Sequence, residues 1–315
     1  KLEKEMNQTI KYTQAIDLFN IEEINSSMQK TELQILVEKM CNKQQQRNLV
    51  RKYFKNILEP IETLIPEHLM NHVLDMLGIL AQRDNIFMTG LVEMIVERND
   101  IEQSKLEIAC TVILMLQLGL VRGEIVRNNL KLFAKFGLDE NTKSILKQYM
   151  YLPPMLVEPL PVGSNEPNKN RGSGHLTIGN DSLILNNNHH TLDICTEFLD
   201  VLNRVQFELN TDIVRLVRNQ WKDLDKPKLV NGKQESQEEY EERVRNFEQY
   251  EQLCLSTFAF LVHNDNKFYF THKYDKRGRV YCCGYSNNYQ GNDYQKAIHQ
   301  LAHKELITDK IKFFD

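Results

Sequence analysis

Cations and aromatic rings gather in one short stretch of the sequence, between residues 267 and 279. This stretch holds a single acid, Asp275, and five basic residues, which are Lys267, Lys273, Lys276, Arg277 and Arg279. Lysine and arginine neutralise phosphates, and tyrosine rings stack on bases or sugars. The composition is typical of a contact with single-stranded or hybrid nucleic acid. An ordinary surface hairpin with a basic turn has the same composition and is the alternative interpretation.

Other chemistry is weakly represented. The histidine pairs in HLMNH (68–72) and HQLAH (299–303) have i, i+4 spacing, but neither has an obvious third ligand, so no metal site is predicted. No phosphate-binding loop, dinucleotide fingerprint or Ser-His-Asp order is visible. The six cysteines form no CxxC pair, and the vicinal Cys282 and Cys283 would point to opposite faces of a strand. Buried, inert thiols in a reducing cytoplasm are therefore expected.

The composition favours a globular fold in which helix predominates. The chain has 315 residues, 41% of them hydrophobic, with only 13 glycines and 8 prolines. A net charge of −4 would repel a polyanion, so any nucleic-acid contact must come from local basic patches. The longest apolar run, 108–121, is shorter than the roughly 20 residues that a membrane span needs. It predicts a core helix and no membrane partner.

The sequence divides into regions of different character. Residues 1–150 show helical periodicity, so an all-helical region is predicted, with Gly119 and Gly123 as candidate helix ends. The next region, 151–191, begins with four prolines in nine residues and is rich in Gly, Asn and Ser. Helix cannot continue through it, so extended segments are expected, with 176–185 as the best candidate for a hairpin.

A long helix is predicted over 192–222. Its apolar residues recur at spacings of three and four, at Phe198, Leu202, Val205, Leu209, Ile213 and Leu216. The opposite face carries four cations, which are Arg204, Arg215, Arg218 and Lys222. These cations face either phosphate or solvent, because any surface helix shows charge opposite its apolar stripe.

A second helix and two strands complete the predicted elements. The stretch 235–251 carries seven glutamates and leads into the apolar segment 253–262, which predicts a helix with an exposed entry and a helical hairpin over 192–263. Two short strands, at 268–270 and 280–283, are expected on either side of the basic turn. The predicted fold class is therefore α+β and predominantly α-helical.

Two motifs near the carboxy terminus resemble those of a known family. Residues 274–281 read YDKRGRVY, and residues 290–293 read QGND. They are similar to the Asp-x-x-Gly-Arg element, with its following Val-Tyr, and to the Gln-Gly-Asn-Asp element of the single-subunit RNA polymerases of bacteriophages, mitochondria and linear plasmids. The Asp-x-x-Gly-Arg element alone would be weak, but its pairing with the second motif is specific.

The resemblance extends in order along the second half of the chain. Residues 151–161 are similar to the family's proline-rich entry segment, and residues 172–175 to the glycine-rich segment that follows it. Residues 192–221 are similar to its first thumb helix, and residues 301–307 to the segment after Gln-Gly-Asn-Asp. The resemblance implies a division into four parts. These are a helical promoter- or template-handling domain (1–150), a connection (151–191), thumb helices (192–266) and the start of a palm (267–315).

The resemblance also implies roles for individual residues. The family's Asp-x-x-Gly-Arg turn holds the template and the RNA–DNA hybrid, so the expected contacts are Lys276, Arg277, Gly278, Arg279 and Tyr281, joined by Arg204, Arg215, Arg218 and Lys222 on the thumb. Gly278 would let the backbone approach a strand closely, and Asp275 would orient an arginine or cap the turn. The residues expected to hold the neighbouring loops are Gln290, Gly291, Asn292 and Asp293.

A second polypeptide is implied as well. In the family two palm aspartates hold two Mg²⁺ ions for nucleotidyl transfer, and both would lie beyond Asp315. The chain is therefore expected to be one subunit of a split phage DNA-directed RNA polymerase, in the cytoplasm of an infected bacterium, with Mg²⁺ bound mainly by its partner. The alternatives are a truncated piece of a longer enzyme and a non-catalytic nucleic-acid-binding factor on a polymerase-derived scaffold. Help from a single-stranded-DNA-binding protein is a further hypothesis.

Overall fold

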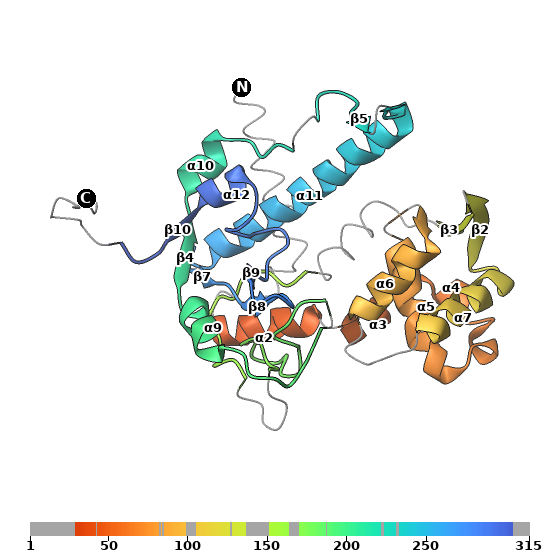
Figure 1. The fold of residues 1–315 in the computed structure, drawn as a ribbon, viewed down its shortest axis with the longest axis horizontal. Helices are drawn as coiled ribbons and strands as arrows, with labels where there is room; N and C mark the ends of the chain where they lie inside the picture. Colours follow the sequence, from red (N-terminus) through yellow and green to blue (C-terminus); the bar gives the residue numbers. More distant parts are fainter. Residues whose placement is uncertain are drawn as a thin grey trace.

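The computed structural model describes residues 29–304 and omits a short list within them, namely 42, 82, 84, 99–104, 127, 137–150, 164–169, 187, 222–223 and 231–232. The fold is α+β, as predicted, with small antiparallel sheets. Figure 1 shows two lobes, the first formed by residues between 43 and 136 and the second by residues 29–41 and 151–304. No described helix is both long and apolar enough to cross a membrane.

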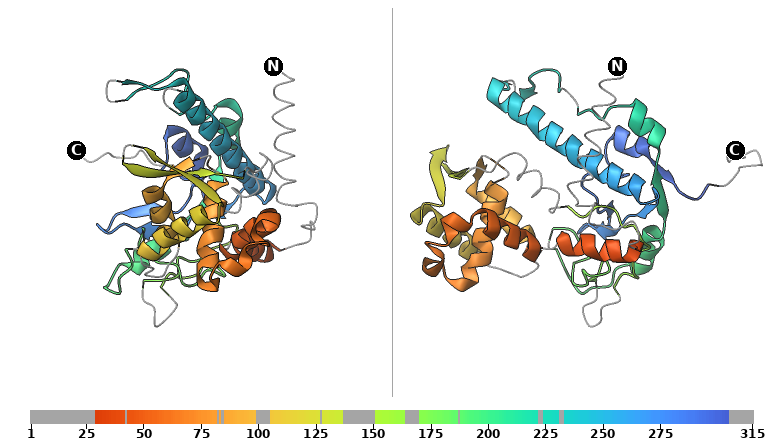
Figure 2. Two further views of the ribbon diagram at one scale, coloured as in Figure 1. Left: turned by 90° about the vertical axis from the view of Figure 1, so that its right-hand side faces the viewer. Right: turned by 180° about the vertical axis from the view of Figure 1, so that it is seen from behind.

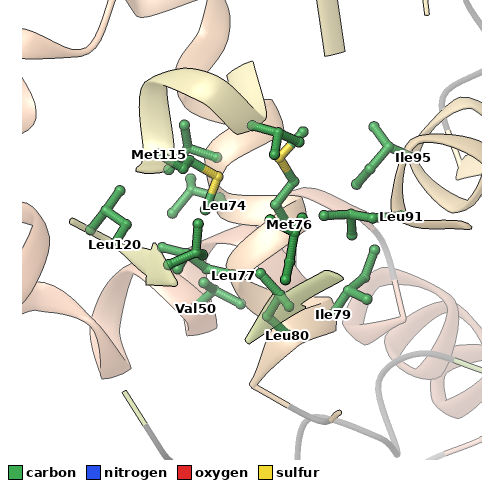
Figure 3. Close-up of a cluster of buried hydrophobic side chains, with 14 of the residues drawn as sticks. Val50, Leu74, Met76, Leu77, Ile79, Leu80, Leu91, Ile95, Met115 and Leu120 are labelled. Atoms are coloured by element: carbon green, nitrogen blue, oxygen red, sulfur yellow. The ribbon is translucent and has the colours of Figure 1, made fainter. Parts of the chain in front are cut away.

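The first lobe packs around one buried helix. Its elements are α3 (Lys43–Tyr53), α4 (Lys55–Leu58), η1 (Glu62–Leu64), α5 (Glu67–Leu80), β1 (Asn85–Phe87), α6 (Met88–Arg98), α7 (Lys105–Gln117), β2 (Val121–Val126) and β3 (Asn129–Ala134). Helix α5 is buried on every side from His72 to Leu80, and most of these residues are apolar, as expected for a helix at the centre of a core. In Figure 3, Leu74 of α5 lies near Met115, while Met76 and Ile79 lie on the side of Leu91.

The apolar run at 108–121 forms most of α7, as predicted. Four side chains of α7 are buried in the core of the first lobe. The helix ends at Gln117, and Gly119, two residues later, has a φ of +68°. This conformation lets the amide of Leu120 donate to the carbonyl oxygen of Met115 at 2.9 Å, a bond that closes helix ends at glycine.

The prediction that residues 1–150 are all helical is wrong within the described part of the chain. Strands β1, β3 and β2 form an antiparallel sheet in that order. Asn128, with a φ of +63°, turns the β2–β3 hairpin, and asparagine tolerates this conformation better than most residues. Gly123 is therefore a strand residue and not a helix end. Strands β2 and β3 are short, and a short apolar pattern in the sequence does not distinguish a strand from a helix.

The second lobe combines helices with three small sheets. Its elements are α2 (Lys30–Met40), α9 (Thr196–Asn203), β4 (Gln206–Leu209), α10 (Thr211–Leu216), β5 (Leu229–Val230), β6 (Lys233–Gln234), α11 (Gln237–His263), β7 (Phe268–Tyr269), β8 (His272–Tyr274), β9 (Val280–Cys282), α12 (Asp293–Ile298) and β10 (His299–Leu301). The sheets are β10-β4-β7, β8-β9 and β5-β6. The predicted strand at 280–283 is confirmed as β9. The predicted strand at 268–270 contains β7, but β7 pairs with β4. The strand that pairs with β9 is β8.

Helix α11 confirms the predicted second helix and its exposed, acidic entry. It begins with a capping box, in which the Ser236 hydroxyl accepts the amide of Glu239 (3.2 Å) and the Glu239 carboxylate accepts the amide of Ser236 (2.9 Å). Its second half carries the apolar side chains, and Phe258 and Leu261 are buried in the core of the second lobe. Figure 2 shows α11 from two further sides as one long helix.

The long helix predicted over 192–222 is wrong, because the chain forms α9, β4 and α10 there. Strand β4 pairs with β7 on one edge and β10 on the other. Asn210 then begins a new helix, and its side-chain oxygen accepts the amide of Ile213 (3.2 Å). Pairing on both edges outweighs the helix propensity of this short stretch. The predicted apolar stripe and the helical hairpin over 192–263 are therefore absent from the described residues.

The proline-rich connection is extended, as predicted, and it pairs both with itself and with other segments. Within it, the amide of Gly172 donates to the carbonyl oxygen of Asp181 (2.8 Å) and the amide of Leu183 to that of Asn170 (2.9 Å). Met155 exchanges two backbone hydrogen bonds with Tyr269, at 2.9 and 2.8 Å. The segment 183–185 exchanges two with Tyr274, both at 2.8 Å. The hairpin predicted over 176–185 does not form, because residues 181–183 pair with 170–172 and residues 183–185 bond to β8.

A buried carboxylate fastens this connection to α2. Glu38 is fully buried, and its oxygens accept the amide of Leu176 (3.0 Å), the amide (2.7 Å) and hydroxyl (2.8 Å) of Thr177, and the Gln34 side chain (2.9 Å). The Nδ1 atom of His175 lies 3.4 Å from the carboxylate. Burial acts to raise the pKa of Glu38, but the hydrogen bonds outweigh it and lower the pKa to about 2.

The first lobe is inserted into the second between two neighbouring points. The Sγ atom of Cys41, at the end of α2, lies 3.9 Å from the carbonyl oxygen of Tyr151. The Gln34 side chain on α2 accepts the amide of Leu156 at 2.8 Å. The chain therefore leaves the second lobe and re-enters it at almost the same place.

The cysteines follow the sequence prediction in part. None of the six, all of which lie among the described residues, forms a disulfide. Cys282 is buried and Cys283 half-buried, and burial raises the pKa of both thiols, that of Cys283 to about 11. The structure therefore confirms burial at Cys282, and the raised pKa values favour the protonated, less reactive thiol at both positions. Cys110 and Cys195 are exposed, contrary to the expectation of burial.

We expect Glu38→Gln to destabilise the protein by about 2–4 kcal/mol, because an amide NH₂ would face backbone donors that the carboxylate now accepts. The loss would be measured by urea unfolding at neutral pH. The pKa of about 2 lies below the ordinary 4.5, so this stabilisation is present above pH 4.5 and is lost as the pH falls towards 2.

The exposed Glu59 provides the control for this prediction. Glu59→Gln should change the free energy of unfolding by less than about 0.5 kcal/mol, as is usual for surface substitutions. Equal unfolding midpoints for the two variants at neutral pH would contradict the anchoring role of Glu38.

Candidate nucleic-acid interface

The basic turn, residues 275–279, connects β8 to β9 and has a defined backbone. The amide of Asp275 donates to the carbonyl oxygen of Arg279 (2.8 Å), which closes the loop. Gly278 has a φ of +80°, and nothing lies within 4 Å of the position that its Cβ would take. Within the chain, glycine is therefore needed for the backbone conformation and not to relieve a close contact.

Asp275 organises the turn. Its Oδ1 accepts the amides of Arg277 (2.8 Å) and Arg279 (3.0 Å), and its Oδ2 accepts Nε of Arg279 (2.8 Å). Oδ2 also lies 2.7 Å from a terminal nitrogen of Arg279 and 3.5 Å from Nε of Arg277. Partial burial acts to raise the pKa of Asp275, but the hydrogen bonds from Arg279 lower it overall. The carboxylate thus fixes the shape of the turn before any ligand binds.

Three exposed cations belong to the same turn as this carboxylate. Lys276 is exposed, and the side chains of Arg277 and Arg279 are 65% and 54% exposed. The guanidinium of Arg279 also lies 5.6 Å from the centre of the Tyr281 ring, a cation–π contact. Because the single carboxylate is engaged inside the turn, the outer surface is positively charged. The turn therefore presents a compact cationic surface beside an aromatic ring.

Gln290 joins the second motif to the strand that follows the turn. Its side-chain oxygen accepts the amide of Cys282 (2.8 Å), and its side-chain nitrogen donates to the carbonyl oxygen of Val280 (3.4 Å). The amide group takes the place of a neighbouring strand on the outer edge of β9. The other edge of the hairpin is bonded to 183–185, so both edges are held.

Asn292 and Gly291 shape the start of α12. Asn292 caps the helix, since its side-chain oxygen accepts the amide of Gln295 (2.9 Å), and its side-chain nitrogen donates to Asn219 (3.3 Å). A Cβ at Gly291 would lie 3.0 Å from the carbonyl oxygen of Asn288, so a side chain would force the backbone to shift. Both residues hold the loop that places Gln290 against β9.

The next residues of α12 include one expected site residue and one that the sequence did not indicate. The side chain of Asp293 is fully exposed and lies 3.7 Å from Lys296, so among the described residues it holds no loop. Gln295 is buried, and its nitrogen donates to the Tyr250 hydroxyl (3.2 Å) and the Ser286 carbonyl oxygen (3.0 Å). No sequence pattern marks this link to α11, because glutamine is usually exposed.

His272 is a second residue that sequence reasoning missed. It is buried on β8, with Nδ1 2.8 Å from the Asn203 side-chain oxygen and Nε2 3.0 Å from the Tyr289 hydroxyl. Burial lowers the pKa of His272 to about 4, so the imidazole is neutral. It connects α9, β8 and the loop before Gln290, and the signal that could have revealed it is its inward position, two residues before the buried Tyr274.

The cations expected on a thumb helix are not brought together. Arg204 follows α9 and lies 3.5 Å from Glu158, with both side chains more than half exposed. Arg215 and Arg218 are exposed, and they lie on and after α10 at the other end of β4. Lys222 lies outside the described residues. The break at β4 therefore removes the single basic face that the helical pattern predicted.

Neither the known protein families nor the curated proteins include a match to this chain. Within the described ranges, no three side chains of His, Cys, Asp or Glu are grouped so that they could hold a metal ion. The chemical capacity of the described site is to bind an anion with arginine and lysine on a preorganised turn.

We expect stability to fall on acidification from about pH 6.5 to pH 4, because His272 has a folded-state pKa of about 4 against an ordinary value of 6.5. In that range the unfolded chain binds a proton that the folded chain does not, so stability decreases as the pH falls, by on the order of 3 kcal/mol. His299, whose pKa burial also lowers to about 4, acts in the same direction.

Urea unfolding across this range would measure the effect. His272→Gln should be less stable than the wild type at neutral pH but show a shallower dependence on pH. His263→Gln, at an exposed position, should keep the wild-type dependence. Parallel pH profiles for the wild type and His272→Gln would refute the assignment.

Gln290→Ala should destabilise the protein by about 1–2 kcal/mol, because it leaves the Cys282 amide and the Val280 carbonyl without their partner. Hydrogen exchange at the Cys282 amide should accelerate by more than the global loss of stability explains. Gln237→Ala, at the exposed start of α11, serves as the control. Unaltered exchange at Cys282 in the Gln290 variant would rule out the coupling of the two motifs.

Proposed function

We propose that this chain is the template- and hybrid-holding subunit of a two-polypeptide, phage-type DNA-directed RNA polymerase. The basic turn would contact backbone phosphates of the template strand and of the RNA–DNA hybrid. A second polypeptide would supply the two palm aspartates, their Mg²⁺ ions and the fingers. The observation that carries the proposal is that the two motifs of the resemblance form one structural unit, in which Gln290 holds the strand that follows the turn.

The chemistry of the turn supports a phosphate ligand. Guanidinium groups bind phosphate through paired hydrogen bonds, and Arg277 and Arg279 keep more than half of their side-chain surface exposed. Asp275 already orders both arginines, so binding would cost less conformational entropy than it would for two mobile side chains. The nearby Tyr281 ring is half-buried and faces Arg279, which suits packing beside a sugar.

The distribution of charge in the second lobe supports a contact at this turn. The net charge of the chain is −4, and the first turns of α11 expose four glutamates, at Glu238, Glu239, Glu241 and Glu242. Such a helix end repels phosphates, whereas the turn attracts them. Nucleic acid would therefore be steered to the turn and away from the acidic end of α11.

Reconstitution tests the proposal directly. The chain would be mixed with a second polypeptide that carries the two aspartates, the first candidate being the product of the adjacent reading frame. The mixture should synthesise RNA on a single-stranded template in the presence of Mg²⁺, and neither component should do so alone. If no such partner gives activity but the chain alone binds an RNA–DNA hybrid, the result would favour the alternative that the chain is a non-catalytic nucleic-acid-binding factor.

In the reconstituted enzyme, Arg277→Ala should weaken binding of an RNA–DNA hybrid by about tenfold, because one charged hydrogen-bonding contact to phosphate is lost. The slope of log affinity against log salt should fall by about one. Arg277 is a cleaner target than Arg279, whose loss would also remove the bonds that order the turn. Arg245→Ala on α11, where the side chain is 56% exposed, is the matched control. Equal affinities of the Arg277 and Arg245 variants for the hybrid would contradict the proposal that the basic turn binds its phosphates.

A further inference from the structure

The sheet of the first lobe has an outward face that the proposed function does not use. In the strand register, two adjacent rows of this face are Asn85, Phe133 and Arg122, and Phe87, Lys131 and Glu124. Alternate residues of a strand point to opposite sides, so these six share one face, called here the outer sheet face. The opposite side of the sheet carries Leu132 and Ile86, which pack into the core of the first lobe.

Two aromatic rings on this face are accompanied by cations. The guanidinium of Arg122 lies 4.8 Å from the centre of the Phe133 ring. The ammonium of Lys131 lies 5.8 Å from the Phe87 ring and 5.5 Å from the Phe133 ring. Phe87 is 41% exposed, and the side chain of Arg122 is 65% exposed. The Phe87 ring therefore lies on the surface and the Phe133 ring is half-buried, with a lysine near both rings and an arginine over Phe133.

Part of this arrangement is structural. Exposed cation–π contacts stabilise a fold modestly, and Arg122 also lies 3.5 Å from the exposed carboxylate of Glu124. These contacts account for the cations but not for a large apolar ring such as Phe87 on the solvent side of a sheet. Figure 1 shows β2 and β3 at the rim of the first lobe, where a ligand could approach the face.

We infer that the outer sheet face binds single-stranded nucleic acid. Bases would stack on Phe87 and Phe133, and the flexible side chains of Arg122 and Lys131 would turn from the rings to pair with phosphates. A duplex would not fit this chemistry, because its bases are stacked on one another and hidden from the rings. This inference does not rest on the proposed function, since it concerns the other lobe and requires no second polypeptide.

The test uses the full chain and a fluorescent oligothymidylate of about 15 nucleotides, long enough for one sheet-sized site. Phe87→Leu keeps an apolar side chain but removes the ring, and it should raise the Kd about tenfold. Arg122→Gln and Lys131→Gln should each lower the salt dependence of binding by about one phosphate contact. Phe198→Leu and Arg51→Gln, at exposed positions outside this face, are the matched controls and should leave the Kd unchanged.

Photocrosslinking separates this face from the basic turn. An oligonucleotide that carries 5-iodouracil should crosslink to Phe87 or Phe133, and Arg277→Ala should not diminish that crosslink. The inference is overturned if the chain binds no single strand, if Phe87→Leu binds as well as the wild type, or if duplex competes as well as single strand. Binding that depends on the cations but not on the rings would likewise exclude a stacking surface. An acidic protein segment would then be the occupant to seek.

Discussion

The second lobe depends on one buried negative charge. Glu38 is on α2, yet the amides that it accepts belong to residues 176 and 177, far along the chain. Because those hydrogen bonds hold the extended connection on one side, the same connection can add backbone bonds to β7 and β8 on the other. Strand β8 leads directly into the basic turn. The position of the exposed arginines is therefore tied to a carboxylate that no ligand would touch.

Side-chain amides take the place of strands in several parts of this lobe. Gln290 bonds to the edge of β9, and Asn266 does the same to Leu209 of β4, accepting its amide at 3.1 Å and donating to its carbonyl oxygen at 2.9 Å. Such bonds satisfy backbone groups that a sheet of two or three strands would otherwise leave open. They also connect distant motifs, which explains in physical terms why the segments 275–279 and 290–293 belong together.

Local patterns could be read from the sequence, and long-range pairing could not. Helices α7 and α11 and the strand β9 followed from apolar runs, an acidic stretch before one of them and a basic turn. The segment 206–209 has a helical apolar pattern, but it is a strand because β7 and β10 lie beside it, and neither neighbour is visible in the local pattern. The buried roles of Glu38, His272 and Gln295 were hidden for the same reason, since polar residues are ordinarily expected at the surface.

The contact between Cys41 and Tyr151 has a consequence for how the molecule can be rebuilt. The points at which the chain leaves the second lobe and returns to it lie close together. The same geometry means that a short bridge from residue 41 to residue 151 would excise the first lobe and leave the rest of the chain continuous. In evolutionary terms, the first lobe is a unit that could be gained, lost or exchanged while α2, the connection that it anchors and the basic turn remain in the chain.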